Sequence, residues 1–392
     1  MKRRKFLAVS AGAGLGVAGC LGAADRALPE VPTGDWTDHA HDVRNTGSAT
    51  VSVPPRGNRA WESGAPRDAA PLVADEAVLS VGETATALEA KTGDQLWERE
   101  LPGTAEQTPS VDSSRLFVTT DQQLVALARE DGEQQWTVPL ARPARRPVTA
   151  SPEHSLVTVP LSAQQGTPGL VAYDAATGDV LWEDQTLAAR TAAIADGLVY
   201  ATGYRQDGET GVVRGLAVSD GSRQWETELT SPDAPPVVTD DGVFVADGGT
   251  LALHDPGDGT RRRSLGTFGD RIAEIPAVTA ETAFVTASDG APVAVSIGDG
   301  TTLWRNDVGV VAGTGVSVGQ GAVVGSVTNL QDRDQAGIAA FERSDGTVRW
   351  EHPIEGFDAF PSTPPVLAEG AVFYVSNENR GVVALGDLPP AK

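Results

Sequence analysis

Residues that could bind a metal ion are few in this chain. The sequence has five histidines and one cysteine, and only His39 and His41 lie close together. Alternating positions in an extended segment would put both rings on one side, but no cysteine or carboxylate cluster beside them completes an obvious ligand set. We therefore interpret them as solvated loop histidines and keep a metal site as the alternative.

Other short signals also favour structural interpretations. Asp332-Arg333-Asp334 and Asn377-Glu378-Asn379 carry oxygen ligands, but neither has the spacing of a calcium loop, so we expect exposed loops. The run Gly313-Thr314-Gly315 has no helical pattern after it, which favours a turn over a phosphate cradle. There is no Gly-x-Ser-x-Gly elbow. We predict no catalytic, metal-binding or cofactor-binding residue.

Arginines gather at two places. Arg142, Arg145 and Arg146 lie among prolines, and Arg261, Arg262 and Arg263 stand in a row. The favoured interpretation is a solvated loop that interrupts a negative field. The alternative is contact with an acidic partner or a lipid headgroup.

An internal repeat sets the elements that would position any site. An apolar strand, a turn of Asp-Gly or Thr-Gly, and a Trp four residues after the Gly recur with a period of about 41 residues. The alternation of period two, broken at each Gly turn, indicates strands and hairpins. A repeat of this length is typical of one four-stranded propeller blade. The Trp residues at the repeat position are Trp61, Trp97, Trp136, Trp182, Trp225, Trp304 and Trp350.

These repeats predict an all-β, eight-bladed β-propeller of four-stranded antiparallel blades. The last blade, from about Thr363 to Leu385, has strand patterns for its inner part but no outer strand. The orphan strand Asn58–Glu62 precedes the first complete blade, so we expect it to complete the last one and close the ring.

The seven repeat tryptophans are predicted to dock neighbouring blades, because each can bury about 150 to 250 Å² against the next sheet. In one repeat Arg263 takes the Trp position. We expect its aliphatic stem to lie in the same slot and to make the weakest contact of the ring.

The repeat phrase resembles the PQQ-type β-propeller repeat, which quinoprotein dehydrogenases share with BamB-type assembly lipoproteins. The stretch from Trp36 to Gly47 also resembles the lead-in of haloarchaeal members of that family. Resemblance to the enzymes implies PQQ and calcium on the ring axis, held by an aromatic surface, a vicinal disulfide, carboxylate and amide ligands, and an Asp base. One cysteine cannot form the disulfide, and Trp36 is the only Trp left outside the docking positions.

The N-terminus resembles a lipoprotein export signal. Arg3 and Arg4 precede an apolar stretch, as in twin-arginine signals, and the segment ending at Cys20 resembles a lipobox. We therefore predict a signal peptide over residues 1–19, a lipidated tether and lead-in over 20–57, and the propeller over 58–388. Lipid on Cys20 would hold the chain at the outer face of the cell membrane, and an uncleaved N-terminal anchor is the alternative.

The composition is strongly acidic, with 53 acidic residues against 30 basic ones and a formal charge of −23. Such self-repulsion is tolerable when salt screens it, and acidic surfaces of this kind are typical of halophilic proteins. The charge also argues against nucleic acid as a partner.

Together these signals favour a non-catalytic, membrane-anchored scaffold without a cofactor, which binds a protein partner through propeller loops. The context we expect for it is cell-envelope assembly. The alternatives are a PQQ-dependent dehydrogenase of alcohols or sugars, or a propeller that binds a glycan or small ligand. Insertions at residues 161–170, 203–214 and 328–337 are the first places to look for a binding surface.

Overall fold

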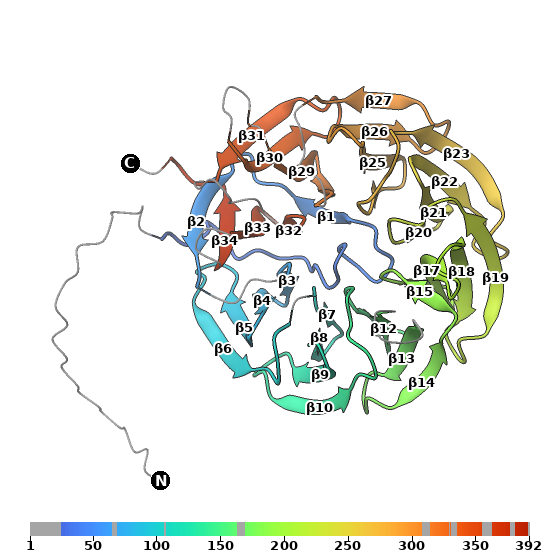
Figure 1. Cartoon of the computed structure of the whole chain (residues 1–392). Coiled ribbons are helices and arrows are strands. Elements are labelled where there is room, and N and C mark those ends of the chain that lie inside the picture. Colours follow the sequence, from blue (N-terminus) through green and yellow to red (C-terminus); the bar gives the residue numbers. More distant parts are fainter. Residues whose placement is uncertain are drawn as a thin grey trace, which may run out of the picture.

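Eight twisted sheets stand around a central axis like the blades of a propeller (Figure 1). The computed structural model describes residues 25–64, 69–105, 107–162, 169–307, 314–328, 330, 335–354, 363–376 and 381–390. The described parts contain no helix. The sequence-based prediction of an all-β, eight-bladed propeller is therefore confirmed.

Blades 1 to 4 follow one another along the chain, and each begins with its innermost strand. Blade 1 comprises β3 (Leu72–Ala74), β4 (Ala77–Val81), β5 (Thr84–Glu89) and β6 (Gln95–Glu100). Blade 2 comprises β7 (Ser110–Val111), β8 (Arg115–Thr119), β9 (Gln123–Ala128) and β10 (Gln134–Pro139). Blade 3 comprises β11 (Thr149–Ser151), β12 (Leu156–Leu161), β13 (Gly169–Asp174) and β14 (Val180–Asp184). Blade 4 comprises β15 (Leu187–Ala189), β16 (Ala193–Ala195), β17 (Leu198–Arg205), β18 (Gly211–Ala217) and β19 (Arg223–Leu229).

Blades 5 to 8 complete the circle, and two of them take in a strand from the N-terminal part of the chain. Blade 5 comprises β20 (Val237–Thr239), β21 (Gly242–Asp247), β22 (Thr250–His254) and β23 (Arg261–Thr267). Blade 6 comprises β24 (Ala277–Val278), β25 (Thr282–Thr286), β26 (Pro292–Ser296) and β27 (Thr302–Arg305). Blade 7 comprises β1 (Ser48–Ser52), β28 (Val316–Gln320), β29 (Ala322–Val327), β30 (Gly337–Glu342) and β31 (Val348–Pro353). Blade 8 comprises β32 (Val366–Ala368), β33 (Ala371–Ser376), β34 (Gly381–Gly386) and β2 (Asn58–Glu62).

Strand β2 closes the ring. It pairs antiparallel with β34, with Trp61 opposite Ala384, and so supplies the outer strand that blade 8 lacks. The predicted completion of the last blade by the N-terminal strand is confirmed. Pairing the two ends of the chain in one sheet leaves no incomplete blade open at the joint.

The outer strands show why the repeat keeps one Trp in each blade. In β6 only Trp97 is buried, while its five neighbours in the strand are exposed. The indole Nε1 of Trp97 donates to the backbone oxygen of Arg129 in blade 2, at 3.0 Å. The six other repeat tryptophans make the same bond to the next blade, with acceptors at Ala90, Ala175, Val218, Pro256, Arg343 and Pro54.

In six of the seven repeat turns the Gly makes room for the Trp of the preceding blade, and the exception is Gly300, which meets Leu265 because blade 5 lacks the Trp. Gly93 has a φ of 78°, and a Cβ at this position would lie 2.7 Å from Cδ2 of Trp61. The turn therefore needs glycine both for its backbone conformation and for the approach of the indole. The Gly turn of one blade and the Trp of the preceding blade therefore form a single packing contact between the two blades.

Blade 4 departs from the expected pattern at residues 203–214, which the sequence suggests to be a loop insertion. Most of these residues extend β17 and β18 into the longest hairpin of the ring, with Gly203 opposite Val212. An extra strand, β15, pairs with the extended part of β17. The insertion is therefore largely sheet. The insertions at 161–170 and 328–337 lie partly outside the described residues.

Candidate functional site at the ring axis

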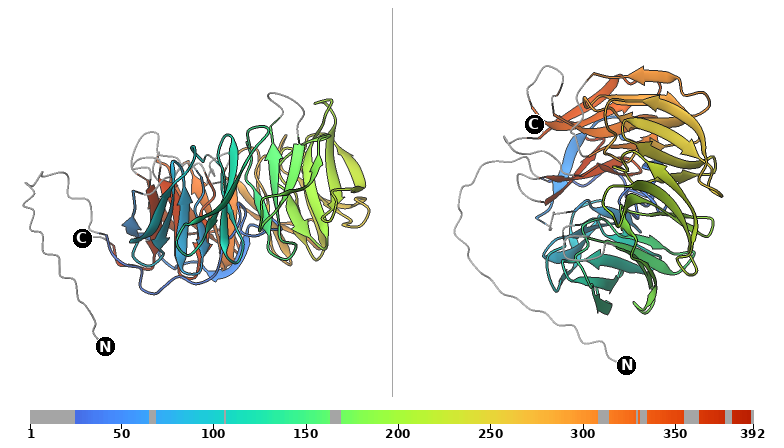
Figure 2. Two further views of the ribbon diagram at one scale, coloured as in Figure 1. Left: turned by 90° about the horizontal axis from the view of Figure 1, so that it is seen from below. Right: turned by 45° about the vertical axis from the view of Figure 1, so that its right-hand side comes forward.

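The N-terminal segment of residues 33–53 lies across the centre of the ring, along the lower face in the left view of Figure 2. Its backbone oxygens accept hydrogen bonds from the inner edges of seven blades. The donors are the N–H groups of Val73 in blade 1, Val111 in blade 2, Ile194 in blade 4, Val238 in blade 5, Val278 in blade 6, Val318 in blade 7, and Glu369 and Gly370 in blade 8. Inner strands would otherwise present unpaired N–H groups at the axis, so the segment satisfies them.

Blade 3 is joined to the axial segment through a side-chain relay. The N–H of Ala150 donates to Oγ of Ser110 at 2.9 Å, and this hydroxyl donates to Oδ1 of Asp38 at 2.5 Å. Asp38 is buried, and burial raises its pKa to about 7, even though the hydrogen bond from Ser110 lowers it. The axial segment thus contacts all eight blades.

A tight turn over residues 41–46 gives the segment its path. Oδ1 of Asp42 accepts hydrogen bonds from the N–H groups of Arg44 and Thr46, both at 3.0 Å. Asn45 has a φ of 59°, and its amide donates to the backbone oxygens of Ala192 and Pro236 at 3.1 Å each. One buried side chain therefore links blades 4 and 5, and Asn suits this position because it tolerates the left-handed conformation.

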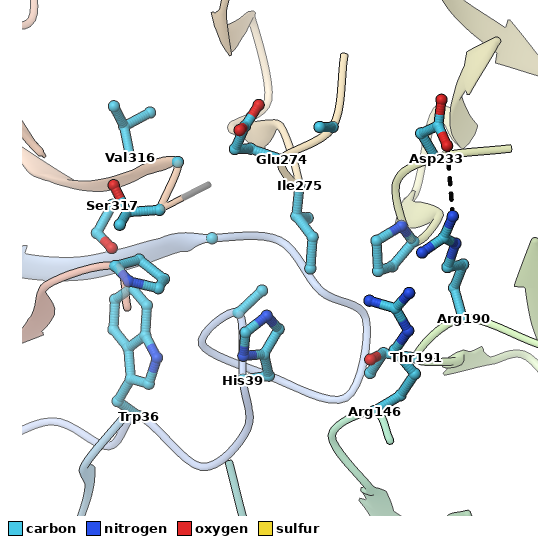
Figure 3. Close-up of a pocket in the computed structure, with 17 residues that line it drawn as sticks. Trp36, His39, Arg146, Arg190, Thr191, Asp233, Glu274, Ile275, Val316 and Ser317 are labelled. Carbon is cyan, nitrogen blue, oxygen red and sulfur yellow. Dashed lines mark hydrogen bonds and ion pairs between the residues drawn. The ribbon is translucent and has the colours of Figure 1, made fainter. Parts of the chain in front are cut away.

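A cavity of about 240 Å³ lies over this segment on the axis. Trp36 and His39 come from the segment itself, and Arg146, Arg190 and Glu274 come from the surrounding blade connections (Figure 3). Apolar side chains such as those of Ile275 and Val316 fill the wall between the charged ones. The chamber therefore combines an apolar lining with a few charged groups, as small binding sites do.

The two arginines of the cavity differ in their partners. Arg190 lies 3.3 Å from Asp233 and donates from Nε to the backbone oxygen of Pro232 at 3.1 Å. Within the described residues, the Arg146 guanidinium has no hydrogen bond or ion pair. Burial, followed by the charge of Arg190, lowers the pKa of Arg146. A guanidinium without an ion-pair partner among the described residues thus faces the cavity.

The two histidines of the sequence analysis have different neighbours. His39 lines the cavity, with Nδ1 at 3.2 Å from Oγ1 of Thr108, and burial, followed by the charge of Arg146, lowers its pKa to about 4. His41 has a φ of 78° and packs edge-on against Trp36, with ring centroids 5.0 Å apart. In the described ranges, no three His, Cys, Asp or Glu side chains converge on a point that could hold a metal ion.

Several other predicted positions fall outside the described residues. These are Arg3, Arg4 and Cys20, the segments 332–334 and 377–379, and Gly313. No helical segment in the described ranges has the length and apolarity needed to cross a lipid bilayer. Arg146 lines the axial cavity and Arg145 lines a neighbouring groove, whereas Arg261, Arg262 and Arg263 lie on the outer strand β23.

The role of the axial segment escaped the sequence interpretation, which treated residues 20–57 as a tether and lead-in. The sequence pattern that could have revealed this role is short. Ala49, Val51 and Val53 alternate with polar residues, and Asp42 precedes a sharp turn. Such a pattern predicts a strand, but it does not tell which blade the strand joins.

The fold and the axial chamber define a class, the eight-bladed propellers built on PQQ-type repeats. Matches to the family described as outer membrane protein assembly factor BamB cover residues 46–265 and 209–392. The chain therefore belongs to this family. No curated protein sequence matches the chain significantly.

Solved structures agree on the fold. BamB from Moraxella catarrhalis superposes with a TM-score of 0.67 at 15% identity, covering 84% of this chain and 99% of that one. Quinohemoprotein alcohol dehydrogenase from Comamonas testosteroni gives 0.70 at 11% identity, covering 91% and 82%. The computationally designed Ika8 protein gives 0.64 at 14% identity, covering 86% and 100%. At these identities the likeness concerns the fold alone.

Proposed function

We propose that the protein is a non-catalytic interaction scaffold, exported and held at the outer face of the cell membrane by lipid on Cys20. The observation that supports this best is the filling of the axis by residues 33–53, whose backbone oxygens bond to the inner strands. The chain thereby covers one end of the ring axis with its own backbone, on the axis where the resemblance to quinoprotein dehydrogenases would place a cofactor. The description of the family supports a role in assembling envelope proteins.

The axial residues do not fit the PQQ and calcium arrangement that the resemblance to quinoprotein dehydrogenases implies. A single cysteine rules out the vicinal disulfide. Trp36, the one Trp outside the repeat positions, is 1% exposed, so its ring face is not available to stack on a quinone. We therefore derive no oxidation step from this site.

The export signal supports the membrane location. Arg3 and Arg4 stand before an apolar stretch, and Cys20 ends a lipobox-like segment. Two variants separate export from anchorage. Replacing Arg3 and Arg4 by Lys should keep the protein inside the cell, whereas Cys20→Ser should release it from the membrane fraction and remove the lipid from its mass. A Cys20→Ser protein that stays membrane-bound would contradict the lipid anchor.

Reconstitution tests the scaffold against the enzyme. The purified chain, incubated with PQQ and calcium, should show neither a bound quinone absorption nor dye reduction with alcohols or sugars. A quinone spectrum with turnover would overturn the scaffold. Cross-linking on intact membranes followed by affinity capture should then recover a protein partner.

A further inference from the structure

A groove between blades 3 and 4 adjoins the axial cavity. This groove has a volume of about 250 Å³, and Arg146 and Arg190 line both spaces. Arg145 adds a third guanidinium, and Pro160, Leu161 and Tyr204 supply apolar walls. The two spaces therefore lie side by side at these two arginines, and we refer to them together as the path.

The charge along this path is opposite in sign to that of the chain. Three arginines line it against two carboxylates, Asp233 and Glu274, in a protein of formal charge −23. Asp233 is already engaged, because it lies 3.3 Å from Arg190 and 3.4 Å from Arg271. The acidic protein as a whole would repel a negatively charged partner, whereas the cationic path would attract it. The charge distribution would therefore direct such a partner to the path.

Arg146 is the strongest attractor on the path. It has no hydrogen bond or ion pair among the described residues. Burial, followed by the charge of Arg190, lowers its pKa, and the charge of Arg146 is in turn the second cause, after burial, of the lowered pKa of His39. An anion beside Arg146 would weaken the repulsion between Arg146 and Arg190. It would also give the partly desolvated guanidinium of Arg146 an ion-pair partner.

The walls favour a polypeptide over a sugar polymer. Glycan sites usually present an open aromatic face on which a sugar ring stacks, but Trp36 is buried and Tyr204 is the only other Trp, Phe or Tyr on the described path. Aliphatic and proline side chains beside guanidinium groups suit an extended peptide with small and acidic residues.

We propose that this path binds an extended, carboxylate-rich segment of a protein partner, with one carboxylate seated at Arg146. The proposal rests on the scaffold function and adds the chemistry of the partner.

A labelled peptide of alternating Glu and Ala tests it by fluorescence anisotropy on the full chain, at the lowest salt at which circular dichroism shows the native fold. Arg146→Glu should weaken binding by about tenfold or more. Arg261→Glu is the matched control, because Arg261 is also exposed and without a described partner but lies on the outer strand β23. It should bind within about twofold of the wild type, since long-range charge alone has a small effect. Arg146→Glu should keep the wild-type melting temperature.

Three results of the binding assays would overturn the proposal. The peptide fails to bind the wild type, Arg146→Glu and Arg261→Glu lose affinity equally, or polygalacturonate binds through Arg146 more tightly than the peptide does. The last result would assign the path to an acidic glycan. If Arg146→Glu leaves partner capture from membranes unchanged, the path is wrong while the scaffold function stands.

Discussion

The indole Nε1 of Trp61 donates a hydrogen bond to the backbone oxygen of Ala90, at a distance of 3.1 Å. Trp61 lies in β2, the outer strand of blade 8, and Ala90 precedes the β5–β6 turn of blade 1. The same ring packs on Gly93. This contact joins the last blade to the first and repeats the geometry by which the other tryptophans join their neighbours.

Trp61→Ala should lower the free energy of unfolding by about 3 to 5 kcal/mol, because it removes a buried ring and leaves a cavity at the ring closure. The melting temperature, measured by circular dichroism, should fall by several degrees. Leu96→Ala is a control, since Leu96 is 57% exposed on an outer strand. Equal melting of Trp61→Ala and wild type would mean that the indole does not hold the joint.

Arg263 occupies the Trp position of blade 5, and its Nη1 donates to the backbone oxygen of Gly298 in blade 6. The arginine thus reproduces the hydrogen bond to the next blade without the buried ring. Arg263→Ala should therefore cost less stability than Trp225→Ala, the matched change in the preceding blade. Urea denaturation of the two variants gives the comparison, and a larger loss for Arg263→Ala would show that its ion and hydrogen bonding outweighs ring burial.

The sequence was sufficient to predict the blades because strand alternation, the Gly turn and the Trp are local patterns that recur with one period. It also placed β2 in blade 8, since an orphan strand and an incomplete blade required each other. The axial site could not be predicted in this way. Arg146, Glu274 and Trp36 are far apart in the chain and meet only through the curvature of the ring. Their individual signals were those of ordinary loop residues.

Asp38 should make stability fall as the pH rises. Burial raises its pKa to about 7 from an ordinary value of 3.8, so the folded state holds the proton that the unfolded state has already lost. Its contribution to stability is therefore fully present below about pH 4 and is lost as the pH rises to about 7. Asp38→Asn should remove this loss.

The measurement is the free energy of unfolding of both proteins in urea at about pH 5 and about pH 8. The advantage of Asp38→Asn over wild type should be larger at the higher pH. Asp240→Asn is the control, because the Asp240 side chain is fully exposed. If the difference in free energy of unfolding between Asp38→Asn and wild type does not change with pH, the result would contradict a raised pKa at Asp38.

Arg214 is 2% exposed and lies 2.7 Å from Asp184 in blade 3 and 2.5 Å from Glu226 in its own blade. Arg214→Ala should cost about 3 kcal/mol, because it leaves Asp184 without its buried ion-pair partner, whereas Glu226 keeps Arg205 and Arg223. Chemical denaturation measures the loss, and Arg261→Ala should change stability little. A small effect of Arg214→Ala would show that water replaces the guanidinium between the blades.

Salt should stabilise the fold. A formal charge of −23 creates self-repulsion that screening weakens, so the melting temperature should rise between about 0.2 M and several molar KCl. A flat curve would remove the inference that the chain is adapted to a saline environment.

The pairing of β2 with β34, together with the contacts of the axial segment, constrains the order in which the molecule assembles. The first described residues leave the ribosome earliest, yet their pairing partners, from Val73 through Gly386, are made over the rest of synthesis. Strand β2 must therefore remain unpaired until β34 has been made. Any nascent chain stalled before β34 would display an open circle with bare strand edges, which is the kind of surface that chaperones and proteases recognise.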